Sequence, residues 1–371
     1  MPAKEPSPLQ RLSALSQSVW VDFISRDLIR GGGLQRMIDE DAVVGATSNP
    51  TIFEKAMTAG DAYDEQLYEL AAQDKGVDET FWALAEQDIK DACEVFRPVW
   101  ERTSGRDGYV SLEVDPRLAY DTLGTFREVM SLHEAVDRRN LLVKIPATKP
   151  GLAAIEDAIA KGRSINVTLI FSLRRYAEVA ESYTRGIERL IAEGGDPRAV
   201  ASVASFFVSR IDTEADRRLD EIGGHEQLKG KLATANAKLA YQHYQETFEG
   251  PRWEFLAAKG AAPQRVLWAS TSTKNPAYPD TMYVEELIGA DTINTMPEET
   301  LRAYQDHGDP QPRLESGLEQ ARQVFDELRA AGVDYEDVTD TLEREGVEKF
   351  SRSFDELLAA LRAKRESLAP A

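Results

Sequence analysis

The sequence predicts an α/β fold, a single (β/α)8 barrel of the TIM type with extra helices after the second strand and at the C-terminus. Short apolar runs alternate with amphipathic helical stretches almost from end to end, which favours a parallel sheet. The runs number eight, which permits closure into a barrel. An open doubly wound sheet is the alternative, but no Gly-x-Gly-x-x-Gly turn follows the first strand.

The predicted strands are apolar and rich in β-branched residues, and turn or polar residues bound them. In chain order they span residues 19–24, 42–46, 108–114, 141–147, 165–171, 200–208, 266–270 and 292–295. Helical periodicity marks residues 119–138, 151–160, 173–192 and 228–248 between them.

Two segments exceed a minimal barrel. Residues 61–102 predict two acidic helices, and residues 314–368 are helical by composition and periodicity, with Glu345 and Lys349 spaced as an ion pair on a solvated face. No Pro/Ser-rich linker sets either segment apart, so we expect one domain over residues 1–371. Residues 1–10 are expected to form a mobile tail, and the C-terminal helix to fold over the barrel mouth.

Composition excludes several classes of function. A net charge of −20 argues against nucleic acid and anionic membranes as partners, because both demand a basic surface. The single cysteine, Cys93, excludes an internal disulfide, and the four histidines lack ligand spacing, so no metal site is expected. No apolar run could span a bilayer and no signal peptide is apparent, which predicts a cytoplasmic protein. The sequence leaves the oligomeric state open.

Lys144 stands alone among apolar residues in the fourth predicted strand. A buried ammonium is costly, so such a lysine is often kept as a neutral amine, which attacks carbonyl carbon to form a Schiff base. Holding it neutral near pH 7 costs roughly 4–5 kcal/mol, an expense from which a structural role gains nothing. The alternative is a strand-end lysine that extends to solvent.

Polar residues lie at or near the carboxyl ends of seven consecutive predicted strands, the end at which barrel enzymes build their active sites. Each could be a cap, a turn residue or half of an ion pair, but the series together predicts a site. In chain order the residues are Asp22, Thr47, Ser48, Asn49, Glu113, Lys144, Asn166, Thr168, Ser205, Arg210 and those from Ser270 to Lys274.

Five sequence stretches contain most of these residues: Gly45-Ala-Thr-Ser-Asn-Pro-Thr-Ile-Phe53, Ser111-Leu-Glu-Val-Asp115, Leu142-Val-Lys-Ile-Pro-Ala-Thr-Lys-Pro-Gly-Leu152, Asn166-Val-Thr-Leu-Ile-Phe-Ser172 and Ser205-Phe-Phe-Val-Ser-Arg-Ile211. In this order, they together resemble the transaldolase family, and the resemblance covers about residues 19–297. The chain length and the segment Trp268-Ala-Ser-Thr-Ser-Thr-Lys-Asn275 are similar to the longer bacterial, actinobacterial-type subfamily.

The resemblance implies catalytic roles for four residues. Lys144 would form the imine with C2 of a ketose phosphate, and Glu113 would move protons through a water held also by Thr168. Asp22 would take the proton from the C4 hydroxyl as the C3–C4 bond breaks. Two carboxylates in distinct settings can divide this work, and the protonated imine serves as the electron sink, so no metal or cofactor is implied.

Further residues would bind substrate by the same resemblance. The hydroxyls of the dihydroxyacetone unit would contact Asn49, Asn166 and Ser205, and the phosphate would contact Arg210, Ser272 and Lys274. Many family members have arginine at the position of Lys274, and lysine binds phosphate without the bidentate fork. The register of Ser270 against Ser272 stays open in the sequence. Arg26 and Arg30 are further phosphate candidates, although a helix start favours the surface for both.

The implied reaction transfers dihydroxyacetone from sedoheptulose 7-phosphate to glyceraldehyde 3-phosphate, giving erythrose 4-phosphate and fructose 6-phosphate in the non-oxidative pentose phosphate pathway. Two alternatives remain. One is an aldolase-type lyase that cleaves fructose 6-phosphate and releases dihydroxyacetone, and the other is a non-catalytic barrel that binds sugar phosphates.

Overall fold

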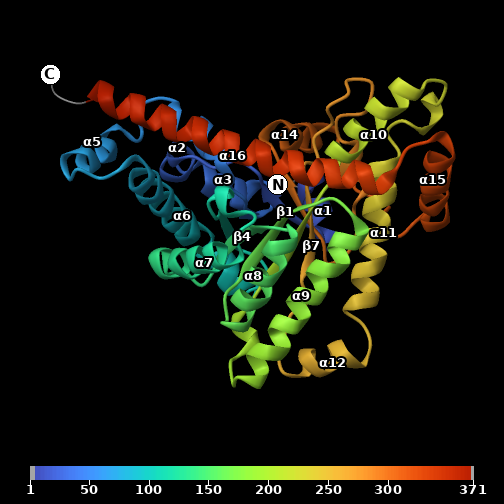
Figure 1. Ribbon diagram of the computed structural model, residues 1–371, viewed down its shortest axis with the longest axis horizontal. Coiled ribbons are helices and arrows are strands. Elements are labelled where there is room, and N and C mark those ends of the chain that lie inside the picture. Colours follow the sequence, from blue (N-terminus) through green and yellow to red (C-terminus); the bar gives the residue numbers. More distant parts are fainter. Residues whose placement is uncertain (1–4, 369–371) are drawn as a thin grey trace.

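The computed structural model describes residues 5–368. Eight parallel strands pair in chain order and close into one barrel (Figure 1), so the predicted (β/α)8 architecture is confirmed and the open sheet is wrong. The strands are β1 (Ser18–Val21), β2 (Val43–Ala46), β3 (Val110–Glu113), β4 (Leu141–Pro146), β5 (Ile165–Ile170), β6 (Ser202–Phe207), β7 (Arg265–Ala269) and β8 (Ile293–Met296).

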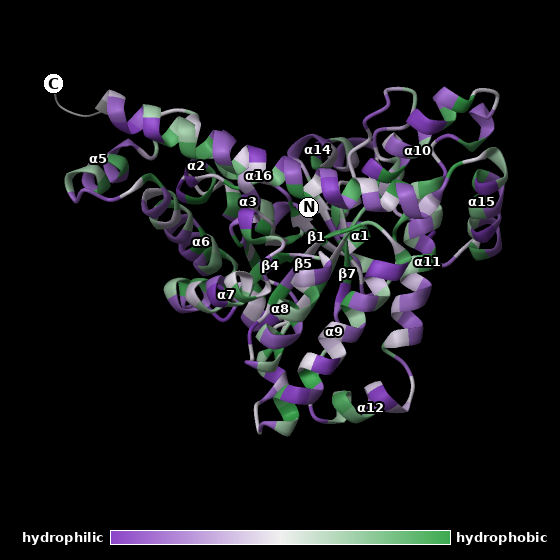
Figure 2. Cartoon of the chain, in the orientation of Figure 1, coloured by the Kyte–Doolittle hydropathy of each residue, from purple (hydrophilic) through white to green (hydrophobic). Residues whose placement is uncertain are grey.

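Helices surround the barrel and bury their apolar faces against it, and Figure 2 shows hydrophobic residues concentrated on the strands. Those before β5 are α1 (Pro8–Ala14), α2 (Arg26–Arg30), α3 (Gly33–Glu40), α4 (Pro50–Thr58), α5 (Asp64–Ala72), α6 (Val77–Arg102), α7 (Thr122–Val136) and α8 (Lys149–Ala160). Those after it are α9 (Leu173–Ala192), α10 (Ser209–Ile222), α11 (Leu232–Thr247), α12 (Pro251–Ala258), α13 (Met282–Glu286), α14 (Glu298–His307), α15 (Leu318–Ala331) and α16 (Tyr335–Leu368).

The N-terminal tail prediction needs correction. Residues 1–4 lie outside the described part of the chain, but residues 8–10 belong to α1. Ser7 and Gln10 form a capping box at its start, Pro8 occupies the first turn, and Leu9 is fully buried.

The extra segments are helical where the sequence predicts. Helices α5 and α6 occupy residues 61–102, and α15 and α16 occupy the C-terminal region. Helix α16 runs across the barrel (Figure 1) and packs along α4, with further contacts to α5, α6 and α10. Among residues 5–368, no helix has both the length and the apolar character that a bilayer crossing requires.

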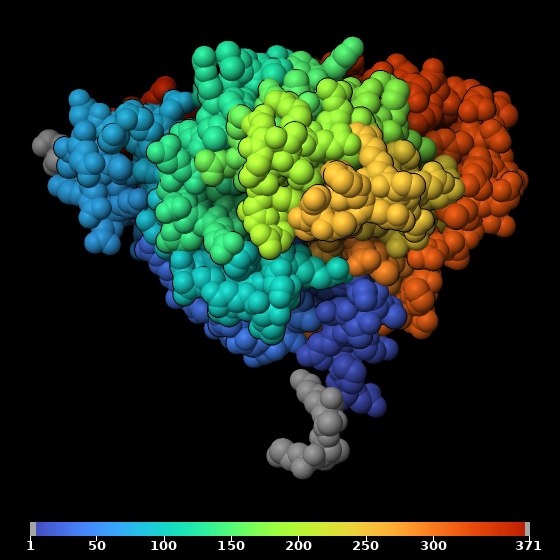
Figure 3. Space-filling model, turned by 90° about the horizontal axis from the view of Figure 1, so that it is seen from below, coloured from blue at the N-terminus to red at the C-terminus, as the bar shows by residue number. Residues whose placement is uncertain are grey.

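The glycine in the 45–53 motif is explained by packing. A Cβ on Gly45 would lie 2.4 Å from the indole of Trp20, which fills the barrel interior beside it. Glycine therefore lets β2 approach β1, and Thr47, Ser48 and Asn49 follow at the carboxyl end of the strand. A buried ion pair joins Arg265, the first residue of β7, to Asp107 at 3.1 Å. Figure 3 shows the molecule from below, the side on which α12 lies in Figure 1.

Candidate active site

Strand register brings three predicted site residues to one level of the barrel. Glu113 on β3 is the register partner of Lys144 on β4, and Lys144 is the partner of Asn166 on β5. Register partners on parallel strands point to the same side of the sheet, here the barrel interior. All three side chains are buried.

The amine of Lys144 is enclosed, with 5% of the side chain exposed. Its Nζ lies 3.1 Å from Oε2 of Glu113 and donates a hydrogen bond to the carbonyl of Ser48 at 2.8 Å. The alternative in which this lysine extends to solvent is therefore wrong. The ring of Phe350, from α16, has its centroid 6.0 Å from the amine.

Glu113 contacts the lysine directly. Burial raises the pKa of its carboxyl, and the charge of Lys144 opposes that effect. Within residues 5–368, neither carboxylate oxygen has a well-aligned hydrogen bond, and the buried hydroxyl of Thr168 has no partner. Oε1 of Glu113 and the Thr168 hydroxyl are therefore free to bind a substrate hydroxyl or a water, while Oε2 lies against the Lys144 amine.

Asp22 follows β1 and is held by the hydroxyl of Thr47, the residue after β2. Its Oδ1 accepts a hydrogen bond from Thr47 at 2.7 Å, and the Thr47 hydroxyl lies 2.9 Å from that of Thr295. Burial raises the pKa of Asp22, opposed first by Lys144 and then by the Thr47 hydrogen bond. A carboxyl with a raised pKa exchanges protons more readily near neutral pH, which suits an acid–base role.

A cavity of about 300 Å³ opens at the carboxyl ends of the strands. Eight of the ten predicted site residues line it: Asp22, Asn49, Lys144, Thr168, Ser205, Arg210, Ser272 and Lys274. The other two, Glu113 and Asn166, are absent from its wall and lie deeper in the barrel. Asn166 accepts a hydrogen bond from Ser205 at 2.7 Å and donates one to Ser111 at 3.0 Å, so it positions Ser205.

The predicted phosphate residues lie together on the cavity wall. Arg210 is the second residue of α10, and its guanidinium lies 5.1 Å from the ring of Phe207. Lys274, in the segment after β7, donates a hydrogen bond to Ser272 at 2.6 Å. The hydroxyl of Ser270 instead lies 2.9 Å from that of Ser209. Of the two serines that the sequence left open, Ser272 is therefore the one that bonds Lys274.

Asn49 lines the cavity, and its Oδ1 accepts a hydrogen bond from Ile52 N–H, which caps α4 and leaves the amide nitrogen available to a ligand. One prediction near this site needs correction. Arg26, expected at the surface, is 3% exposed and pairs with Asp88 at 2.8 Å, so it is a structural residue. Arg30 does lie at the surface.

Sequence reasoning missed several residues of the wall. Lys55 comes from α4, and Lys349 and Phe350 come from α16. Lys349 faces the cavity rim and forms no ion pair with Glu345 among the described residues, contrary to the predicted pairing. The motif pattern offered no signal for these positions, since which side of a helix faces a site depends on tertiary packing.

The sequence profile of the transaldolase/fructose-6-phosphate aldolase family matches residues 19–361 of this chain. The chain belongs to that family. It is 53% identical over 366 residues to the transaldolase of Acidothermus cellulolyticus, covering 97% of this chain and 98% of that protein. It is 49% identical over 373 residues to the transaldolase of Mycobacterium bovis, covering all of both chains. The transaldolase function predicted from the motifs, and with it the class of transferase, is thereby confirmed.

Proposed function

We propose that this transaldolase moves a dihydroxyacetone unit from sedoheptulose 7-phosphate to glyceraldehyde 3-phosphate through an imine on Lys144, and that it acts in the cytoplasm. The observation that carries the proposal is an enclosed amine 3.1 Å from a buried carboxyl, in the wall of a cavity that Arg210 and Lys274 also line. Full-length similarity to transaldolases favours transfer over the lyase reaction.

Imine formation needs a neutral amine and a proton for the departing water. Because burial raises the pKa of Glu113, that carboxyl can accept a proton from Lys144 and leave the amine free to attack C2. The resulting acid then returns the proton to the carbinolamine hydroxyl, which leaves as water. Thr168 supplies a hydroxyl beside this step, since it lines the cavity and its oxygen is unpaired within the described residues.

Cleavage follows from the protonated imine. Asp22 removes the proton of the C4 hydroxyl, the C3–C4 bond breaks, and its electron pair moves into the iminium to give an enamine on Lys144. The aldose phosphate leaves as an aldehyde. When glyceraldehyde 3-phosphate enters, the enamine attacks its carbonyl carbon and Asp22 returns the proton to the new hydroxyl.

Binding distant from the reacting bond orients the sugar. Ser205, held by Asn166, and the amide nitrogen of Asn49 are placed to contact the hydroxyls of the dihydroxyacetone unit. Arg210, Lys274 and Ser272 are placed for the phosphate. Such contacts lower the activation barrier of the reaction because they hold the substrate in the reactive geometry, although they do not touch the bond that breaks.

Borohydride trapping tests the assignment. Reduction in the presence of fructose 6-phosphate is expected to leave a three-carbon adduct on Lys144, located by peptide mass spectrometry. Lys144→Ala should remain folded by circular dichroism and lose both the adduct and turnover, whereas Lys149→Ala, at an exposed lysine after β4, should keep both. An adduct on another lysine, or none, contradicts the proposal.

A second measurement separates transfer from lysis. With fructose 6-phosphate and no acceptor, a transferase releases little free dihydroxyacetone, because the enamine waits for an aldehyde. Sustained release over many turnovers would identify the lyase instead.

A further inference from the structure

Four cations surround the cavity without an acidic partner among residues 5–368. Arg210 and Lys274 belong to the proposed phosphate site, and Lys55 and Lys349 lie on the rim from α4 and α16. None of the four takes part in any of the ion pairs found in the described structure, although the chain carries 64 acidic residues against 44 lysines and arginines. Leaving four cations unpaired in so acidic a protein requires an explanation.

These cations interact with one another. The pKa of Lys349 is lowered, first by the positive charge of Arg210, then by burial, and then by Lys274 and Lys55. Mutual repulsion of this kind favours an anion in the space between the charges. The acids on the same wall are Asp22, which accepts a hydrogen bond from Thr47, and Glu299.

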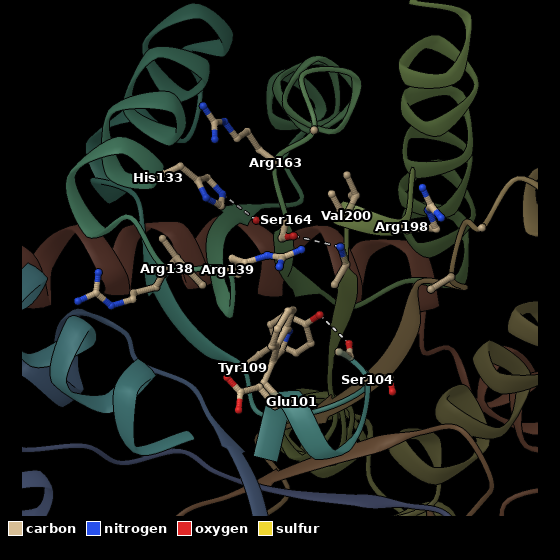
Figure 4. Close-up of a pocket in the computed structure, with 18 of the residues that line it drawn as sticks. Glu101, Ser104, Tyr109, His133, Arg138, Arg139, Arg163, Ser164, Arg198 and Val200 are labelled. Atoms are coloured by element: carbon tan, nitrogen blue, oxygen red, sulfur yellow. Dashed lines mark hydrogen bonds between the residues drawn. The ribbon is translucent and has the colours of Figure 1, made fainter. Parts of the chain in front are cut away.

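A second basic cavity offers a contrast. It measures about 670 Å³ at the amino ends of the strands, and Figure 4 shows Arg138, Arg139, Arg163 and Arg198 around it. There Glu94 pairs with Arg138 at 2.7 Å and Asp196 pairs with Arg198 at 2.9 Å, while Glu101 and Asp137 line the same wall. Arg139 and Arg163 take part in none of the ion pairs of the described residues. Two of the four arginines of this cavity are therefore paired, whereas none of the four cations at the barrel mouth is.

Helix α16 is fixed over that mouth at several points. Ser353 accepts a hydrogen bond from Thr51 of α4 at 2.9 Å. Phe350 lies over the Lys144 amine, and Gly346 packs against Leu169, the residue after Thr168 on β5. Lys349 adjoins Phe350 in sequence, so the helix that encloses the reacting amine also brings a cation to the phosphate side of the cavity.

We propose that Lys349 is a substrate-binding residue that contacts the phosphate of the sugar together with Arg210 and Lys274. Lys55 adds to the positive electrostatic potential at the phosphate. The C-terminal helix thereby sets the preference for phosphorylated over unphosphorylated substrates. This inference rests on the proposed function, since it assigns a further role in the same cavity. A phosphate dianion offers three acceptor oxygens, enough for several charged donors at once.

Substrate preference tests the inference. In Lys349→Gln, the ratio of kcat/KM for fructose 6-phosphate to that for fructose, each with the same acceptor, should fall about tenfold, as expected for loss of one charge-assisted hydrogen bond. The loss should appear mainly in KM. The inhibition constant of inorganic phosphate should rise in parallel, and Lys349→Arg should restore both.

Arg352→Gln is the matched control, because it removes one exposed cation from the same helix outside the cavity wall. If Lys349→Gln changes the ratio and phosphate inhibition no more than Arg352→Gln does, the inference is overturned. The proposed function has an independent readout, because wild-type trapping on Lys144 can succeed whether or not Lys349 contacts phosphate. Failure of that trapping would instead remove the proposed function.

Discussion

Replacing Asp212 by Asn tests how the protonation of one buried carboxyl changes the free energy of unfolding of the protein. Asp212 lies on α10, two residues after Arg210, and is 1% exposed. It accepts hydrogen bonds from Ala233 N–H at 2.7 Å and from the Tyr283 hydroxyl at 2.8 Å, so it joins α10 to α11 and α13. Burial raises its pKa from 3.8 to about 7.

The sign of the effect follows from the two states of the chain. The unfolded carboxyl ionises near 3.8, whereas the folded one keeps its proton up to about pH 7. Between these values the folded state binds more protons, so the free energy of unfolding falls as the pH rises through this window. Across the whole window, ionisation of Asp212 lowers the free energy of unfolding by ~4 kcal/mol, at 1.36 kcal/mol per unit of difference in pKa. Asn keeps an acceptor for Ala233 N–H and cannot ionise.

Urea unfolding at about pH 4.5, 6 and 7.5 measures the effect. The Asp212→Asn protein should gain stability relative to the wild type as the pH rises, by a few kcal/mol over the range. Asp220→Asn, at a mostly exposed position on the same helix, should run parallel to the wild type. A difference between Asp212→Asn and the wild type that stays constant across the three pH values would refute the reasoning.

Two further predictions concern the reaction. Asp22→Asn should still form the imine but not break the C3–C4 bond, so borohydride with fructose 6-phosphate should leave a six-carbon adduct on Lys144, and a three-carbon adduct would show that another group takes the proton. Truncation from Phe354 onward removes a ring packed 5.1 Å from that of Phe81 and should loosen α16 over the mouth, so acceptor-free release of dihydroxyacetone should rise several-fold as water reaches the imine. Unchanged release would argue against α16 as a lid.

The sequence predicted the barrel well because each buried strand is a short apolar run with turn residues at both ends. β5 begins at Ile165 as expected, and β6 is shorter than predicted by two residues at its start and one at its end. The missed feature is α1, although its signal was present: Ser7 and Gln10 have the spacing of a capping box and Pro8 stands at the first helical position. The proline-rich start obscured it.

The site was predictable where it is built from strand ends and from the residues that follow them, such as Arg210 at the start of α10. The carboxyl ends of all eight strands meet at one face, so Asp22, Glu113 and Lys144 could be placed together without knowing any distance. Residues contributed by helices follow a different rule. Lys349 sits in a charged, amphipathic stretch in which every polar position predicts solvent, and only the path of α16 across the mouth brings it to the cavity.

Backbone strain occurs at the barrel mouth, where strand ends and helix α16 both supply site residues. Leu169 and Ser270 are non-glycine residues with φ of 59° and 58°, a conformation that costs of order 1–2 kcal/mol each. At Leu169 the pairing of β5 with β6 shifts register between Val167 and Ile170, as at a β-bulge. The bulge lets Thr168 line the cavity while the next side chain packs against Gly346 of α16, where a Cβ would come within 3.0 Å. The irregular part of β5 is therefore where a strand that supplies a cavity residue meets the helix that covers the mouth.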